Sequence, residues 1–163
     1  MKTIYVYPGT FSPPTFGHLD IARQAAAILP ELIILCSKNP DKEESWFTPE
    51  ECCSLWKAYD LPDNVKIMTL SEFQSLSIKS KNIVIIRGLR NPYDLEQEKK
   101  VIFLNRDCFG IKKYFYILGL KKNQKISSSR VRKDVANLNL KNLNRQISPP
   151  VINALLEKIK IAV

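Results

Sequence analysis

The chain has 163 residues, of which 45% are hydrophobic and 25% are charged, and its formal net charge is +9. This apolar content excludes an intrinsically disordered chain and is enough for one substantial core, so we expect a single domain over residues 1–163. No apolar run approaches the length of a membrane span, and Met1 to Tyr7 is too short for a signal peptide, so we expect a cytoplasmic protein.

Short apolar runs rich in β-branched residues alternate with longer helical patterns, which is typical of βα units. Residues Ile83 to Ile86 are continuously apolar, as expected for a parallel strand that is covered on both faces. Strands are predicted at Thr3 to Tyr7, Leu32 to Cys36, Val65 to Met68, Asn82 to Ile86 and Lys113 to Ile117. The sequence therefore predicts an α/β fold with a doubly wound, parallel, five-stranded sheet, whose ligands bind beyond the carboxyl ends of the strands.

Helical periodicity fills the segments between and after these strands. Leu19, Ala22, Ala26 and Leu29 share one helical face, and Thr48 to Glu51 is typical of a capping box with proline at the first helical position. Further helices are predicted at Pro92 to Phe109, at Ser129 to Leu138 and, at the C-terminal end, at about 150–161.

The segment after the first strand, Pro8 to His18, has the composition of a phosphate-binding loop. Its glycines, Gly9 and Gly17, let a backbone approach a ligand closely, and it carries three hydroxyl side chains and the only histidine of the chain. It is neither a Walker loop nor a GxGxxG fingerprint. A lone histidine at a helix start has an alternative explanation, in which local hydrogen bonds satisfy His18 and it has no ligand.

Two further segments follow predicted strands. Arg87 to Arg90 places two guanidinium groups around a glycine, which suits the binding of two phosphates; alternatively, these arginines pair with the acidic residues that follow. Ser127, Ser128 and Ser129 mark a helix start, where hydroxyls and unpaired N–H groups bind phosphate, although one serine that merely caps the helix would leave the same pattern. All three segments are expected to converge at one edge of the sheet.

The positive charge is unevenly distributed. Residues 1–111 carry 13 Lys and Arg against 14 Asp and Glu, whereas residues 112–163 carry 12 against 2. A polyphosphate ligand gives this basic excess a use. The alternative, a nucleic-acid-binding module, is disfavoured because the chain lacks an aromatic platform for bases.

The four cysteines, Cys36, Cys52, Cys53 and Cys108, have neither the spacing of a zinc site nor the density of a secreted disulfide scaffold. We therefore expect reduced structural thiols and no metal site built by the protein alone.

In their order and spacing, the three segments closely resemble those of the phosphopantetheine adenylyltransferases, members of a nucleotidyltransferase superfamily marked by TxGH and ISSSxxR motifs. Here the motifs read Thr15 to His18 and Ile126 to Arg132, and Tyr7 to Phe11, Arg87 to Arg90 and Glu98 are similar to that branch of the superfamily. The resemblance runs from about residue 3 to residue 135. It departs from the family pattern at Ser12, Phe16, Gln74 and Asn123 to Lys125.

The resemblance implies that the protein transfers the adenylyl group of ATP to 4'-phosphopantetheine, giving dephospho-coenzyme A and pyrophosphate, with Mg2+ and as a homohexamer. It implies that His18 stabilises the transition state and that Thr10 and Lys42 orient the attacking phosphate. The implied acceptor site comprises Thr10, Lys42, Gln74 and Arg87. The implied ATP site comprises Thr10, Phe11, His18, Gly88, Leu89, Arg90, Glu98, Asn123, Gln124, Lys125, Ile126, Ser127, Ser128 and Ser129.

Other acceptors, such as nicotinamide mononucleotide or glycerol phosphate, remain alternatives, because one fold serves several related reactions. A catalytically degenerate relative is disfavoured because both Thr10 and His18 are present.

Overall fold

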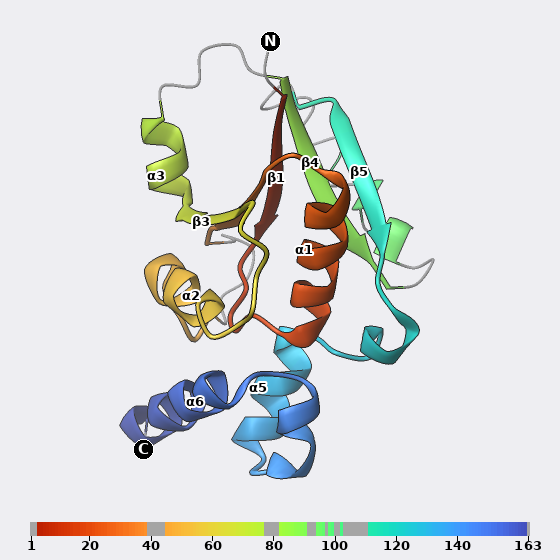
Figure 1. The fold of residues 1–163 in the computed structure, drawn as a ribbon. Helices are drawn as coiled ribbons and strands as arrows, with labels where there is room; N and C mark the ends of the chain where they lie inside the picture. Colours follow the sequence, from red (N-terminus) through yellow and green to blue (C-terminus); the bar gives the residue numbers. More distant parts are fainter. Residues whose placement is uncertain are drawn as a thin grey trace.

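The computed structural model describes residues 3–38, 45–76, 82–90, 94–96, 98, 99, 102 and 111–162. It contains the predicted five-stranded sheet, in which every pair of neighbouring strands is parallel (Figure 1). The strands are β1 (Thr3–Gly9), β2 (Leu32–Cys36), β3 (Val65–Thr69), β4 (Asn82–Leu89) and β5 (Lys113–Leu118). The predicted start of every strand is confirmed, and four strands extend one to three residues further toward the carboxyl edge.

The strand order is β3-β2-β1-β4-β5, so β1 and β4 lie side by side although 72 residues separate the end of one from the start of the other. Their register pairs Val6 with Ile85. After β1 the chain moves outward to β2 and β3, and from β4 it moves outward in the opposite direction. The order therefore reverses between β1 and β4, which is where a sheet of this kind opens a ligand crevice at its carboxyl edge.

Helices connect the strands and close the carboxyl end of the molecule. They are α1 (Phe16–Ile28), α2 (Pro49–Trp56), α3 (Leu70–Ser75), α5 (Ser128–Ala136) and α6 (Pro149–Ala162), with short 3-10 helices at Lys121–Asn123 and Leu140–Arg145. The capping box predicted for α2 is confirmed, because Thr48 and Glu51 exchange hydrogen bonds. The predicted helix at Pro92 to Phe109 lies mostly outside the described residues, although residues 94–96, 98, 99 and 102 are helical.

Apolar side chains cover both faces of the sheet, as a doubly wound fold requires. Neighbouring strand residues alternate between the faces: Tyr7 and Ile86 belong to the main core with α1, α2, α5 and α6, whereas Val6 and Ile85 belong to a smaller cluster. Phe73 of α3 packs against this smaller cluster. The helices therefore lie on both sides of the sheet.

The C-terminal segment packs against the main core. Val151 and Leu155 of α6 are fully buried, and Ile159 is partly buried, so the predicted apolar stripe faces the protein. Lys158 joins α6 to α2 through a 2.7 Å ion pair with Glu51. Figure 1 shows α5 and α6 together beyond the carboxyl ends of the strands. None of the helices in the described ranges is long and apolar enough to cross a membrane.

Candidate active site

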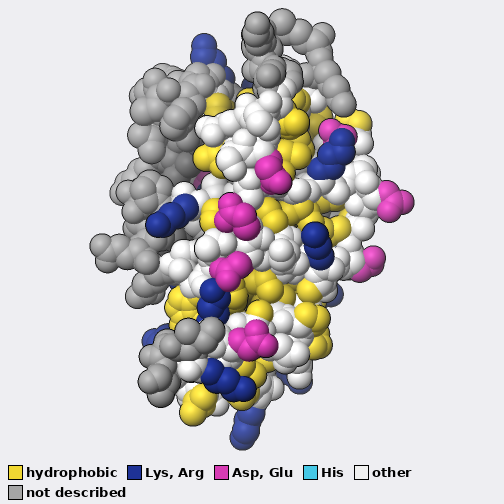
Figure 2. Space-filling view, turned by 90° about the vertical axis from the view of Figure 1, so that its left-hand side faces the viewer, with side chains coloured by type: hydrophobic (Ala, Val, Ile, Leu, Met, Phe, Trp, Pro, Cys, Tyr) yellow, Lys and Arg dark blue, Asp and Glu magenta, His cyan; other side chains and the backbone are white. Residues whose placement is uncertain are grey.

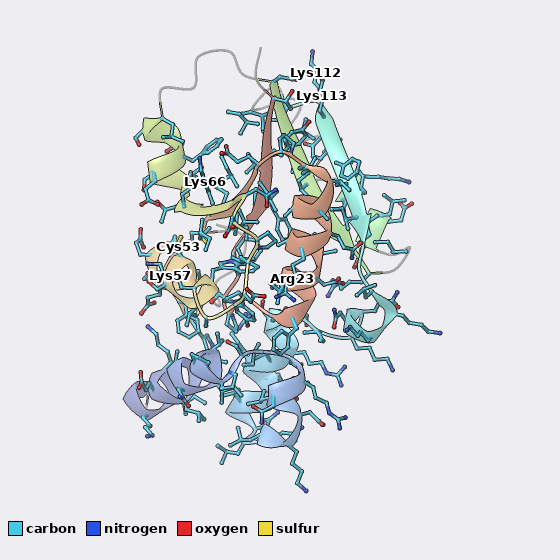
Figure 3. All side chains as sticks on the ribbon, in the orientation of Figure 1. Arg23, Cys53, Lys57, Lys66, Lys112 and Lys113 are labelled. Atoms are coloured by element: carbon cyan, nitrogen blue, oxygen red, sulfur yellow. The ribbon has the colours of Figure 1, made fainter. Side chains whose placement is uncertain are left out.

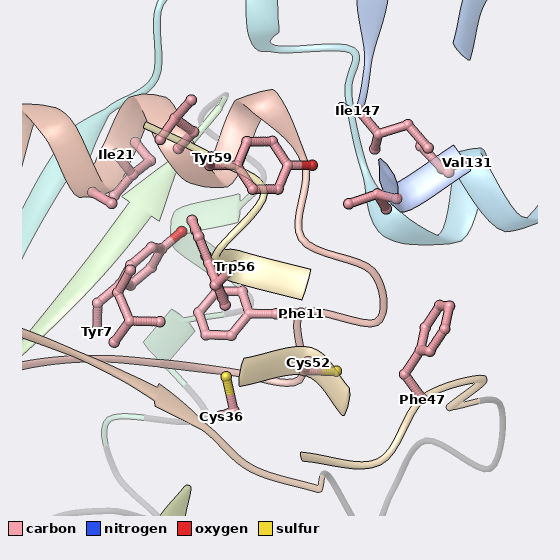
Figure 4. Packing of buried hydrophobic residues seen from close by; sticks show 14 of the residues in the cluster. Tyr7, Phe11, Ile21, Cys36, Phe47, Cys52, Trp56, Tyr59, Val131 and Ile147 are labelled. Carbon is pink, nitrogen blue, oxygen red and sulfur yellow. The ribbon is translucent and has the colours of Figure 1, made fainter. Parts of the chain in front are cut away.

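The side chain of Phe11 anchors the loop that follows β1. Phe11 is only 3% exposed, and its ring meets those of Tyr7 and Trp56 edge-on at centroid distances of 5.3 and 5.2 Å (Figure 4). It also meets the His18 ring edge-on, at 5.1 Å. Its φ of 44° is uncommon for a bulky residue, so burial of the ring holds the backbone in a strained conformation.

Gly9 has a different role from the one expected from the sequence. A Cβ at Gly9 would lie 2.7 Å from the Phe11 ring. The space that glycine leaves is therefore filled by Phe11, and it is not open for a ligand. Any contribution of Phe11 to ATP binding is left to its backbone, because its side chain belongs to the core.

His18 is held at the start of α1 by a reciprocal cap with Thr15. The Thr15 N–H donates to His18 Nδ1 over 3.1 Å, and the His18 N–H donates to Thr15 Oγ1 over 3.4 Å. Because Nδ1 accepts a hydrogen, the neutral ring carries its own proton on Nε2. Local hydrogen bonds do hold His18, as the alternative supposed, and the bonds to Thr15 engage Nδ1.

Thr15 was not among the site residues predicted from the sequence. A capping box is recognised by Glu or Gln three residues after the cap, and here histidine takes that position. The signal that could have revealed it was the cap residue itself, a threonine three positions before the only histidine.

Thr10 lines a pocket of about 200 Å3 at the carboxyl ends of β1 and β2. Its other walls are Ser37, Lys38, residues 45–49, Glu51 and Lys158. The ends of the two strands are joined by a 3.0 Å hydrogen bond from the Ser37 N–H to the Gly9 carbonyl. The predicted site residue Lys42 lies outside the described residues.

The loop after β1 and helix α5 are in direct contact, at the end of the sheet where the sequence predicts that the segments converge. Ser128 Oγ donates to the Pro13 carbonyl over 2.8 Å, and Arg132 donates to the Ser12 carbonyl over 2.5 Å. A Cβ at Gly17 would be in ordinary van der Waals contact, at 3.6 Å, with the backbone carbonyls of Asn123 and Ile126. The segment before α5 therefore borders Gly17, but its approach does not require glycine there.

The three serines at the start of α5 have separate roles. Ser127 is the cap, because its side chain accepts the Arg130 N–H over 3.2 Å. Ser128 binds the loop after β1, while Ser129 is exposed. The starts of α1 and α5 thus lie against each other, and both present the positive ends of helix dipoles.

Arg87 and Glu98 form a bidentate pair at the end of β4. Arg87 Nε and Nη2 donate to the two Glu98 carboxylate oxygens over 2.7 and 2.5 Å, and Nη1 reaches the Pro8 carbonyl at 3.5 Å. Burial would lower the pKa of Arg87, but the hydrogen bonds and charge of Glu98 raise it above its ordinary value. Arg87 therefore stays charged and bridges β4 to β1 at the reversal point.

Arg90 is also paired with an acidic neighbour. Its side chain and its backbone N–H donate to Asp94 over 2.8–3.1 Å, at an exposed position. Both arginines thus show the acidic pairing considered as an alternative from the sequence. Pairing and phosphate binding are compatible, because a guanidinium has five N–H donors and Glu98 uses two of them on Arg87.

Phe16 and Ser12, two departures from the family pattern, both contact neighbouring parts of the protein. Phe16 meets the Tyr59 ring edge-on at 5.6 Å, and its N–H donates to the Gln146 carbonyl over 2.8 Å. Ser12 Oγ accepts the Phe47 N–H over 3.1 Å. Tyr59 adds a 2.7 Å hydrogen bond from its hydroxyl to the Pro14 carbonyl. The loop from Ser12 to Phe16 is therefore fixed from several sides.

Of the remaining predicted site residues, Gln74 is exposed on α3, after the edge strand β3, and its contact with the acceptor stays a prediction. Gly88 and Leu89 are half-buried at the end of β4. Asn123, Gln124 and Ile126 are half-buried and Lys125 is exposed, in the turn beside Gly17.

The basic excess of residues 112–163 is only partly at this site. Lys121, Lys122 and Lys125 adjoin the predicted nucleotide contacts, but Lys112 and Lys113 lie at the opposite end of the sheet (Figure 3). The side of the molecule formed by α2 and α3 carries interspersed positive and negative side chains, and the single histidine is not visible there (Figure 2). A polyphosphate ligand therefore accounts for part of this charge.

Within the described ranges, no group of three or more His, Cys, Asp or Glu side chains is arranged to hold a metal ion. Cys36, Cys52 and Cys53 are free thiols. Burial raises the pKa of Cys36 and raises that of Cys52 to about 12, so both are neutral, unreactive thiols. Cys108 lies outside the described residues.

A parallel sheet with the TxGH segment (Thr15 to His18) and the ISSSxxR segment (Ile126 to Arg132) side by side at its carboxyl end is typical of a nucleotidyltransferase. Residues 6–134 match the family described as cytidylyltransferase-like. Nicotinic acid mononucleotide adenylyltransferase from Plasmodium falciparum shares the fold with a TM-score of 0.62 at 15% identity, over 99% of this chain and 96% of that one.

Similar proteins of known name indicate which family of nucleotidyltransferases the chain belongs to. The phosphopantetheine adenylyltransferase of Mannheimia succiniciproducens is 31% identical, covering 96% of this chain and 98% of the relative. That of Leptospira biflexa is 34% identical, covering 99% and 100%. The chain belongs to the phosphopantetheine adenylyltransferase family.

Proposed function

We propose that the protein transfers the adenylyl group of ATP to 4'-phosphopantetheine, producing dephospho-coenzyme A and pyrophosphate. The observation that carries this proposal is the contact between the TxGH segment and the start of α5, in which Ser128 Oγ donates to the Pro13 carbonyl and Gly17 borders Asn123 and Ile126. This contact supports the proposal because it holds the start of α1, which carries His18, against the start of α5. The names of the full-length relatives support the choice of acceptor.

The proposed reaction is an in-line displacement without a covalent enzyme intermediate. An oxygen of the acceptor phosphate bonds to the α-phosphorus of ATP while the bond from that phosphorus to the bridging β-oxygen breaks, and pyrophosphate leaves with the electron pair. The protein needs only to position the two phosphates and stabilise the charge that develops. His18 suits this task because the Thr15 N–H fixes Nδ1 as an acceptor, which places the proton of the neutral ring on Nε2, the nitrogen proposed to donate to an oxygen of the transferring group.

Thr10 suits the acceptor phosphate. It lines the pocket at the ends of β1 and β2, together with Ser37 and Lys38. Lys42 is proposed to neutralise the same phosphate. Arg87 adds a fixed positive charge at the neighbouring strand end, where Glu98 holds its guanidinium in place.

Mg2+ is proposed to arrive with the triphosphate. Mg2+ at phosphate-transfer sites is held largely by substrate oxygens and water. Bound there, it would neutralise charge on the phosphates. The starts of α1 and α5 then supply the N–H donors that the protein adds.

Pyrophosphate release tests the proposal. Purified protein would be assayed with ATP and each of 4'-phosphopantetheine, nicotinamide mononucleotide and glycerol phosphate. Of the three acceptors, only 4'-phosphopantetheine is expected to give pyrophosphate release from ATP. Release only with another acceptor would keep nucleotidyl transfer but reject this acceptor, and no release with any of them would reject the proposal.

The oligomeric state and location are also proposals. We infer a cytoplasmic homohexamer from the resemblance to the family. Light scattering on the purified protein would test the hexamer, and fractionation of the source cells would test the location.

A further inference from the structure

The carboxylate of Asp20 holds Leu120, the second residue after the end of β5. Asp20 lies on α1 and is only 8% exposed. Its Oδ2 accepts the Leu120 N–H over 2.7 Å, and its Oδ1 accepts a hydrogen bond from Gln24 Nε2 over 3.1 Å. Both oxygens of a nearly buried carboxylate are thus engaged by neutral donors, and one of these donors belongs to a segment 100 residues away in sequence.

Leu120 begins the path to the predicted nucleotide contacts. It follows Gly119, whose N–H donates to the Leu89 carbonyl over 2.8 Å, and it precedes the 3-10 helix Lys121–Asn123. We call residues 123–129 the nucleotide loop. The bond from Asp20 to Leu120 therefore fixes where the chain departs from the sheet, three residues before this loop begins.

Helix α1 also contacts the other strand end that faces the crevice. A Cβ at Gly88 would lie 2.7 Å from Ile21 Cγ1, so Ile21 occupies the space that this glycine leaves. A Cβ at Gly119 would likewise be in van der Waals contact with Ile21 Cδ1, at 3.8 Å. Within four residues, α1 carries His18, the contact to Leu120 and the contact to Gly88.

We propose that Asp20 is a positioning residue for nucleotide binding. By accepting the Leu120 N–H, it sets the nucleotide loop at a fixed distance from His18 on the same helix. Asp20 touches neither substrate, and it acts through the backbone of Leu120. This inference rests on the proposed function, because it takes ATP as the ligand of the nucleotide loop.

Leu120 offers a direct test from the loop side of the bond. Its φ of −57° suits proline, so Leu120→Pro removes the N–H that Asp20 accepts while keeping this backbone angle. Leu120→Ala is the matched control, because it keeps the N–H and shortens a side chain that is 49% exposed. The dissociation constant for ATP, measured by calorimetry without acceptor, is expected to rise about tenfold in Leu120→Pro, as for loss of a charge-assisted hydrogen bond, and to stay unchanged in Leu120→Ala.

Asp20 tests the same bond from the helix side. Asp20→Ala is expected to raise the KM for ATP about tenfold with little change in the KM for the acceptor. The KM for ATP of Asp20→Asn should lie between those of wild type and Asp20→Ala, because its amide oxygen still accepts the Leu120 N–H. The double variant Asp20→Ala/Leu120→Pro should bind ATP no more weakly than either single variant, since all three lack the same bond.

Unchanged ATP binding in both Leu120→Pro and Asp20→Ala would overturn the inference and leave the proposed function intact. The variants could instead lose affinity for ATP and for the acceptor equally, in proportion to the unfolded fraction seen by circular dichroism. That result would show that Asp20 has a merely structural role, and it would also overturn the inference. If Leu120→Pro does not fold, the order of ATP affinities in wild type, Asp20→Asn and Asp20→Ala decides. Failure of the unaltered protein to bind ATP would reject the proposed function together with the inference.

Discussion

Thr15 holds the His18 ring through both its backbone and its side chain. Its N–H and its Oγ1 both lie 3.1 Å from His18 Nδ1. The Phe11 ring supports the imidazole edge-on, with its centroid 5.1 Å away. These contacts fix the orientation of the ring and its tautomer, which are the two properties that a donor to a developing charge must have in advance.

Two amide substitutions separate the structural role of His18 from its proposed catalytic role. In His18→Asn, the side-chain oxygen replaces Nδ1 as the acceptor of the Thr15 N–H, but nothing replaces Nε2. We expect normal folding and ATP binding with turnover reduced about 100- to 1,000-fold, as for loss of a transition-state donor. His18→Gln places an amide nitrogen near the position of Nε2 and should retain more turnover. Steady-state rates and calorimetry would check both, and nearly normal turnover in His18→Asn would contradict the assignment.

Removing the Thr15 hydroxyl should weaken the helix cap and loosen the histidine. Thr15→Val is nearly isosteric at this fully buried position, and the loss of the cap should lower the free energy of unfolding by about 1 kcal/mol. The turnover number should fall as well, because only the backbone N–H then orients Nδ1. Urea unfolding and steady-state rates would be compared with Thr15→Ser, which restores the hydroxyl. Equal activity in the valine and serine variants would argue against a positioning role.

Glu98 should be much more important to stability than the acidic partner of Arg90. Glu98→Ala leaves the guanidinium of Arg87, whose side chain is 26% exposed, without its bidentate partner, and we expect a loss of about 2–4 kcal/mol. Asp94→Ala breaks a more exposed pair, where Arg90 is 45% exposed, and should lose less than about 1 kcal/mol. Denaturant unfolding of the two variants checks this order, and equal losses would contradict it.

The ion pair between α2 and α6 predicts a pH dependence of stability. Hydrogen bonds from Lys158 and from the Thr48 backbone lower the pKa of Glu51 below its ordinary value of 4.5. A carboxyl group with a depressed folded-state pKa stabilises the fold above its unfolded pKa and loses this effect as the pH falls through the folded pKa. Glu51→Gln should therefore be less stable than wild type at pH 7, with the difference shrinking below about pH 4.5. Urea unfolding across this range checks it, and a difference that grows in acid would refute it.

Most of the fold could be predicted because its signals are local. Every strand contains several apolar residues within its first five positions, and α2 begins with a capping box. The strand ends extend further than predicted because Pro8, Gly9, Arg87 and Gly88 read as loop residues, yet they still pair with neighbouring strands. Helix α3 was missed because it is only six residues long, although Thr69 and Glu72 form a capping box that the sequence displays.

The site was less predictable because its key contacts join distant residues. The meeting of the two motif loops followed from the sheet topology, but no spacing rule pairs Ser128 with Pro13 or Asp20 with Leu120. Gly9 illustrates the same limit, since its reason for being glycine is a ring two residues away that folds back on it. Which of these residues contact ATP or the acceptor stays a prediction.

The contacts that fix the loop from Ser12 to Phe16 have a consequence for how the protein folds. The Gln146 carbonyl accepts the Phe16 N–H, so the shape of this early loop depends on a residue 130 positions later. The Ser148 N–H also donates over 3.4 Å to the hydroxyl of Tyr59, which in turn holds Pro14. Contacts that close such long stretches of chain are slow to form. Affinity for ATP should therefore appear late in refolding, after the sheet has formed. Intermediates in which the C-terminal segment is not yet packed against the core should not be stabilised by added ATP.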